Sequence, residues 1–350
     1  MKNSTNFIGI AFAILICLLY VSCENAPAAK SNKIVTLPKP IAEDTIKIAD
    51  TMVVEDLPLD TADYNKRVLY LAHDSITKRW PASTPTPIKG AILPFKRIVA
   101  YYGNFYSRHM GILGSLPEDQ LITNLNAEVE QWRKADTLTP AIPAIHYIAI
   151  TAQSKPGKGN TYRIRMPEKQ ILKAVSLAEK IKGITFLDIQ VGHSSVAKEL
   201  PTLEQYLINP DVHLGLDPEW SMKDGSIPGR KIGSMDAADI NFAVDYLSKL
   251  VKKHNLPPKI LVVHRFTKGM ITNSNKIKTT PEVQIVINMD GFGFPAKKKD
   301  SYKRFVSGYP VQFTGLKLFY KNDIKSKPYR MMSPKEILQL YPKPIYIQYQ

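Results

Sequence analysis

Cysteine is scarce in this 350-residue chain, and its only two copies, Cys17 and Cys23, lie near the amino terminus. The rest of the chain therefore forms no disulfide and carries no thiolate chemistry. No Gly-x-Gly-x-x-Gly follows the first predicted strand, and no Walker motif, His-x-His or His-Glu-x-x-His occurs. These absences remove the main sequence support for a nucleotide-binding protein or for a tight metal motif, and we expect no cofactor.

Long apolar runs are also missing, because the longest, residues 8–21, has 14 residues, whereas a spanning helix needs about 20. One lysine precedes this run, and Ser22 with Cys23 ends it. The pattern resembles a bacterial lipoprotein signal peptide, which implies removal of residues 1–22 and lipid attachment to Cys23. Tyr20 stands where such signals usually have leucine. An uncleaved membrane anchor is the alternative, and both predict a membrane-anchored, extracytoplasmic protein of the cell envelope.

Residues 23–94 are rich in proline and polar residues, including Thr-Pro-Thr-Pro at 84–87. Such a composition buries little apolar surface and favours extended chain. We predict a lipid-anchored, mostly extended tether here, with one short helix over residues 68–76 that docks on the folded body.

Residues 95–350 predict one domain of the α/β class, a single (β/α)8 TIM-type barrel. Eight short apolar runs read as strands, and helical patterns separate most of them. The expected strands are 98–102, 142–150, 184–190, 212–216, 260–263, 283–289, 311–319 and 345–347. The expected helices are 117–134, 167–181, 196–208, 237–254, 297–306 and 333–340.

A barrel enzyme builds its site at the carboxyl ends of its strands, and polar residues collect there in pairs two positions apart. We predict Glu219, Asp217, Asp188 and Asp290 as catalytic residues. The predicted substrate contacts are Tyr101, Tyr102, Gln190, Trp220, His264, Asn288, Phe292, Lys317, Tyr320, Tyr346 and Gln348. For three residues a structural role is the alternative: Gln348 closing the barrel, Asp290 in an Asp-Gly turn, and His146, mid-strand, as a core histidine.

Asp217 and Glu219 are the most informative pair, since they follow a buried strand and precede Trp220. If the strand continues, both carboxyl groups face one cavity, and their mutual repulsion raises one pKa. That suits a general acid near neutral pH. The alternative is a helix start, with Asp217 as the N-cap and Pro218 at the first helical position.

The stretch Leu216-Asp-Pro-Glu-Trp220 belongs to an ordered set that looks like a family of uncharacterised bacterial secreted proteins and lipoproteins. The set also includes Leu187-Asp-Ile-Gln190, Met289-Asp-Gly-Phe-Gly293 and Tyr346-Ile-Gln-Tyr-Gln350. Asp-x-Glu at a strand end resembles, more loosely, barrel glycoside hydrolases of the chitinase type. That likeness implies that Glu219 protonates the leaving oxygen while Asp217 positions an N-acetyl group or a partner. The longer Asp-x-x-Asp series of chitinases is missing, because Leu214, Gly215 and Leu216 precede Asp217.

Three functions follow as hypotheses. The first is a glycoside hydrolase, with Asp188 or Asp290 as base or nucleophile; carboxyl groups about 5–5.5 Å apart favour retention and about 6.5–9.5 Å inversion. The second is metal-assisted hydrolysis, for instance of a phosphodiester, by His193, His264, Asp217, Glu219 and Asp290. The third is a non-catalytic polysaccharide-binding or structural lipoprotein.

The net charge of the chain limits the binding partners that we expect. Residues 1–60 carry a net charge of −2 and the whole chain +16, which leaves +18 on residues 61–350. We expect a region with this much positive charge to bind polysaccharides or other anionic envelope polymers, and lipid headgroups. Nucleic acid is not expected outside the cytoplasm, and we expect a monomer.

Overall fold

A computed structural model describes residues 58–350 of the protein. Eight parallel strands form a closed barrel, since β1 pairs with β11 on one side and with β2 on the other. The barrel strands are β1 (Arg97–Gly103), β2 (Ala141–Ala152), β4 (Ile184–Ile189), β5 (Val212–Leu216), β7 (Lys259–Arg265), β9 (Val283–Met289), β10 (Phe313–Leu318) and β11 (Tyr346–Tyr349). The predicted (β/α)8 barrel and its eight strands are confirmed, because buried parallel strands read as continuous apolar runs.

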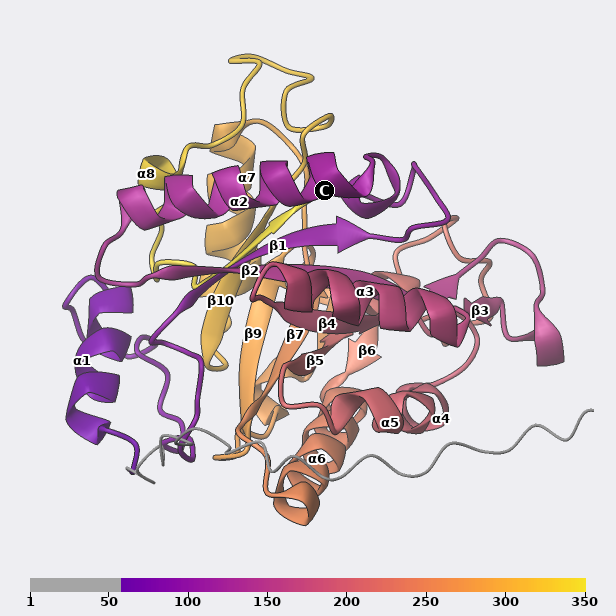
Figure 1. Ribbon diagram of the computed structural model, residues 1–350, viewed down its shortest axis with the longest axis horizontal. Coiled ribbons are helices and arrows are strands. Elements are labelled where there is room, and N and C mark those ends of the chain that lie inside the picture. The colour runs from indigo at the N-terminus through magenta and orange to yellow at the C-terminus, as the bar shows by residue number, and fades with distance from the viewer. Residues whose placement is uncertain (1–57) are drawn as a thin grey trace, which may run out of the picture. The chain divides into compact units, whose positions relative to one another are not determined.

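Helices alternate with these strands, and α2, α3 and α6 run along the outside of the barrel (Figure 1). The helices are α1 (Thr61–Leu71), α2 (Glu118–Ala135), α3 (Glu168–Lys180), α4 (Val196–Glu199), α5 (Glu204–Leu207), α6 (Ala237–His254), α7 (Pro295–Tyr302) and α8 (Pro334–Ile337). The helix predicted over 196–208 is instead divided by a 3-10 turn that contains Pro201, because proline cannot donate the hydrogen bond that an α-helix interior needs. Three short strands of the described residues lie outside the barrel: β3 (Arg163–Arg165) pairs with β2, and β6 (Met235–Asp236) pairs with β8 (Ile271–Thr272).

The interior of the barrel is largely apolar at the end where the strands begin, with His213 and Gln284 as buried, hydrogen-bonded exceptions. Ile98, Phe186 and Val262 pack there in one cluster with Tyr64 and Leu71 of α1. Strand residues that point outward form the second apolar cluster, against the surrounding helices. The carboxyl half of the interior is polar, and the functional side chains lie in that half.

Residues 58–94, which we expected in the tether, join the folded body. Helix α1 covers Thr61–Leu71 rather than the predicted 68–76, and Ile76 is exposed. The Tyr70 hydroxyl donates to Asp136 Oδ1 at 3.0 Å, and Lys343 Nζ donates to the Tyr70 carbonyl at 2.9 Å. The folded body therefore includes residues 58–94, which precede the expected boundary at residue 95.

The predicted signal peptide of residues 1–22, the lipidation of Cys23 and the first part of the tether lie outside the described residues. Within residues 58–350, no helix has the length and apolar character that crossing a membrane requires.

Candidate active site

A cavity of about 580 Å³ opens at the carboxyl end of the barrel. Eight of the predicted site residues line it: Tyr102, Gln190, Asp217, Glu219, Trp220, Asp290, Phe292 and Lys317. Several aromatic side chains that we did not predict line it as well: Phe266, Phe305 and Phe319. The cavity thus combines three acidic side chains, two lysines, Lys297 and Lys317, and several flat aromatic faces.

Asp217 and Glu219 reach the cavity through a turn rather than through a continued strand. The residues Pro218–Trp220 form a 3-10 turn with Asp217 as its N-cap, and Asp217 Oδ1 accepts from the Glu219 backbone N–H at 3.1 Å. The helix-start interpretation of the sequence is therefore right about the backbone. It does not displace the functional one, because both side chains still line the cavity.

The environment of Glu219 favours its protonated form. Burial, helped by the negative charge of Asp290, raises the pKa of Glu219 to about 7. Burial also raises the pKa of Asp217 well above its usual value, although the positive charge of His264 opposes this. A carboxyl group that keeps its proton near neutral pH can protonate a leaving oxygen.

Asp290 is held in the opposite state by two cations. Its Oδ1 lies 3.0 Å from Lys317 Nζ, and its Oδ2 lies 2.9 Å from His264 Nδ1. Burial alone would raise the pKa of Asp290, but these neighbours outweigh it and keep the pKa below the usual range. Lys317 Nζ also lies 3.7 Å from the centroid of the Tyr102 ring, so both cationic and aromatic contacts fix it in the cavity wall.

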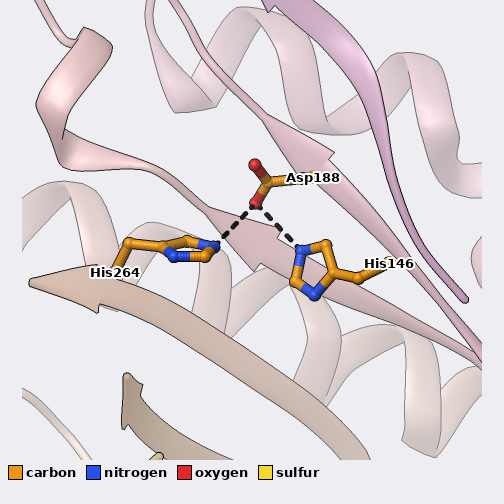
Figure 2. Close-up of side chains that lie close together, drawn as sticks. All are labelled: His146, Asp188 and His264. Carbon is orange, nitrogen blue, oxygen red and sulfur yellow. Dashed lines mark ion pairs between the residues drawn. The ribbon is translucent and has the colours of Figure 1, made fainter. Parts of the chain in front are cut away.

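Asp188 does not line the cavity, so the structure does not place it where a nucleophile would act. Its Oδ1 lies 3.3 Å from His146 Nε2 and 3.6 Å from His264 Nε2 (Figure 2). All three side chains are fully buried. Burial would raise the pKa of Asp188, yet the two histidines lower it. Burial lowers the pKa of His146 to about 4, whereas the carboxylates of Asp290 and Asp188 overcome burial and raise that of His264 to about 10.

Four further predicted substrate contacts lie within the barrel but do not line the cavity. Asn288 Nδ2 donates to Gln348 Oε1 at 3.3 Å, and Gln348 Nε2 donates to the Tyr346 hydroxyl at 2.9 Å. These three side chains and His264 are fully buried. This network links β9 to β11 inside the barrel, and the prediction that these residues contact substrate stays a prediction.

Tyr101 and Tyr320 lie on the outer side of the barrel. Successive strand residues point to opposite faces, so Tyr102 faces inward and Tyr101 packs outward with Tyr320 and Tyr349. Tyr320 also donates to Glu128 of α2 at 2.9 Å. Neither tyrosine lines the cavity, and the same alternation, applied from Lys317, would have selected Phe319 instead of Tyr320.

The side chains proposed for a metal in the second hypothesis do not gather as a set. His193 Nε2 contacts the Ser226 carbonyl at 2.8 Å, and its ring packs on Tyr162. It does not line the cavity that Asp217, Glu219 and Asp290 share.

No family model and no curated protein sequence matches the chain. Among solved structures, it is similar to the YdhT protein from Bacillus subtilis at 12% identity and a TM-score of 0.39, over 83% of this chain and 86% of that one. It is similar to the mannanase man26 of Bacillus subtilis at 12% identity and a TM-score of 0.37, over the same shares. A ruminal GH26 endo-beta-1,4-mannanase matches at 12% identity and a TM-score of 0.35, over 73% of this chain and 59% of that one. These values assign no residue a role.

Proposed function

We propose that the protein is a lipid-anchored, extracytoplasmic glycoside hydrolase that acts on an envelope or environmental polysaccharide. The observation that carries this proposal is the cavity in which Asp217, Glu219 and Asp290 meet Trp220 and other aromatic rings. Glycosidases need two carboxyl groups in different protonation states around the scissile bond, and aromatic faces pack well against sugar rings.

Glu219 is assigned as the general acid, because its pKa of about 7 leaves much of it protonated at neutral pH. Asp290 is assigned as the base or nucleophile, because Lys317 and His264 stabilise its carboxylate. Asp217 orients the turn that carries Glu219 through its hydrogen bond to the Glu219 backbone. Asp188 drops out of the catalytic assignment because it does not line the cavity.

The surrounding charge supports an anionic polymer as substrate. The body carries the excess of positive charge noted above, and Lys297 lines the cavity with its ammonium group 5.1 Å from the centroid of the Phe292 ring. Phe292 is 54% exposed, so a chain of sugar units can approach it from solvent.

The test incubates the full-length protein, purified in mild detergent, with peptidoglycan, chito-oligosaccharides, mannans and acidic polysaccharides, and follows product masses. The matched variants are Glu219→Gln and Glu130→Gln, since Glu130 lies on the exposed face of α2. We expect the unsubstituted protein and Glu130→Gln to cleave one polymer class, and Glu219→Gln to lose at least about 100-fold in rate.

Equal cleavage by Glu219→Gln would remove Glu219 from its role. Binding of a polymer without products would favour the non-catalytic alternative. The anomeric form of the first product, followed by NMR, decides between retention and inversion.

A further inference from the structure

Three ligand-type side chains meet inside the barrel on separate strands: His146 on β2, Asp188 on β4 and His264 on β7. Their nearest nitrogen and oxygen atoms all lie within 4.8 Å of one another. Asp188 Oδ1 stands between the two imidazoles, 3.3 Å from one Nε2 atom and 3.6 Å from the other (Figure 2). The cluster contains none of the carboxyl groups assigned to glycan cleavage, but His264 contacts one of them, Asp290, at 2.9 Å.

Hydrogen bonding within residues 58–350 leaves the central atoms of this cluster without partners. His146 Nε2, Asp188 Oδ1 and His264 Nε2 are all buried, and none of them has a hydrogen-bond partner in that part of the chain. The distances of 3.3 and 3.6 Å to Asp188 Oδ1 are those of ion pairs, which form only when an imidazole is protonated. Unpartnered buried polar atoms are costly, and three that converge on one point need a common partner.

The outer atoms of the same three residues are all fixed. His146 Nδ1 contacts the Tyr346 hydroxyl at 2.6 Å, and His264 Nδ1 contacts Asp290 Oδ2 at 2.9 Å. Asp188 Oδ2 accepts from the Tyr102 hydroxyl at 3.0 Å. Metal-binding histidines and carboxylates are oriented in this way, with one atom toward the ion and the other held by a neighbour.

Gly215 of β5 provides the space for the converging atoms. A Cβ at this position would lie 2.3 Å from Asp188 Oδ1 and 2.5 Å from His146 Nε2. The inward-facing position next to Asp188 is therefore open because it has no side chain.

We propose that His146, Asp188 and His264 bind one divalent transition-metal ion, and that zinc fits best. With bonds of about 2.0–2.1 Å, the ligand atoms of a tetrahedral zinc site lie roughly 3.3–3.4 Å apart, close to the separations of 3.3 and 3.6 Å. Two imidazoles and one carboxylate form a common zinc ligand set. Binding requires a neutral His264, because a ligating imidazole nitrogen gives up its proton. The ion then supplies the positive charge in this part of the barrel, links β2, β4 and β7, and leaves His264 Nδ1–H to hold Asp290 Oδ2.

The first test needs no substitution and no glycan. Full-length protein is purified in detergent, without chelators, from cells grown with added zinc or cobalt, and its metal is measured by inductively coupled plasma mass spectrometry. We expect about one ion per chain. Cobalt-grown protein should show the intense visible absorption of tetrahedral Co²⁺, and X-ray absorption should show imidazole neighbours.

Variants locate the ion. His146→Gln and His264→Gln should each lose it, whereas His254→Gln should keep it, because His254 is an exposed histidine at the end of α6 and controls for adventitious surface binding. If either core variant does not fold, the spectra of the unsubstituted protein still decide the question.

Two results would overturn the proposal. One is protein with less than about a tenth of an equivalent of metal from both cultures, which would leave the cluster as a buried ion pair of Asp188 with protonated histidine. The other is full metal content in folded His146→Gln and His264→Gln. The proposal does not rest on the glycosidase assignment, since its measurements involve no catalysis.

Discussion

Asp136 at the carboxyl end of α2 offers a sharp test of how residues 58–94 join the barrel. Its Oδ2 accepts from Arg97 Nη1 at 2.7 Å, and its Oδ1 accepts from the Tyr70 hydroxyl of α1 at 3.0 Å. The Arg97 side chain is fully buried and that of Asp136 is 2% exposed. The substitution Asp136→Asn would leave the guanidinium group buried without a counter-charge.

Breaking a buried pair from one side costs about 3–5 kcal/mol of unfolding free energy. Over residues 58–350, with an unfolding entropy of about 2.1 cal/mol/K per residue, this corresponds to a melting temperature about 5–8 °C lower. Tyr70→Phe removes only one neutral donor and should cost about 1 kcal/mol. Asp63→Asn, in a half-exposed pair with Arg67, should cost at most about 1 kcal/mol.

The three variants are compared by denaturant titration and thermal unfolding at pH 7, and then at lower pH. Burial would raise the pKa of Asp136, but Arg97 outweighs it and lowers the pKa below its usual value. The stabilisation that ionised Asp136 gives the folded state is therefore complete above the unfolded pKa of about 3.9. It disappears as the pH falls through the lower pKa that Asp136 has in the folded state. If Asp136→Asn cost no more than Asp63→Asn, the buried pair of Arg97 with Asp136 would not exist as described.

Three further predictions concern the cavity and the cluster below it. The rate of glycan cleavage should fall as the pH rises through about 7, because Glu219 with a pKa of about 7 loses the proton it must donate; a kcat/KM profile that stays flat to pH 9 would contradict this. Trp220→Ala should weaken oligosaccharide binding about tenfold, or about 1.4 kcal/mol, with little change in kcat, as measured by calorimetry and initial rates. Gly215→Ala should cost about 1–3 kcal/mol of stability, because its Cβ would overlap Asp188 and His146; an unchanged melting temperature would show that this close approach is absent.

The barrel could be predicted because its strands are buried on both faces and therefore stand out as apolar runs. The carboxyl ends of those runs then identified Asp217, Glu219, Asp290 and Lys317, all of which line the cavity. Packing in three dimensions decides what the sequence could not. Phe305 lies in a π-helical turn after α7, and no local pattern indicates that this turn faces the cavity.

The sequence also could not predict how far from the cavity each inward-facing side chain lies along the barrel axis. Asp188 and Gln190 are two apart and face the same way, yet Gln190 lines the cavity and Asp188 does not. Strand alternation predicts the side of a residue but not its layer, because the layer depends on how neighbouring strands are staggered. His146 illustrates the same limit: an interpretation as a core histidine describes its burial and misses its neighbours Asp188 and His264.

The buried polar side chains inside the barrel, His146, Asp188 and His264, are the feature that most needs a functional reason. Buried ionisable groups reduce stability unless they are fully paired, and apolar residues could fill the same space. His146 Nε2, Asp188 Oδ1 and His264 Nε2 have no hydrogen-bond partner within residues 58–350, while His264 Nδ1 contacts Asp290 in the cavity wall. A chain selected only for stability would have no use for this arrangement, whereas one that must hold a carboxylate in a fixed position beside Glu219 would benefit from it. The cluster and the cavity are therefore best understood as one unit, in which the buried His264 positions Asp290, the carboxylate that we propose meets the substrate.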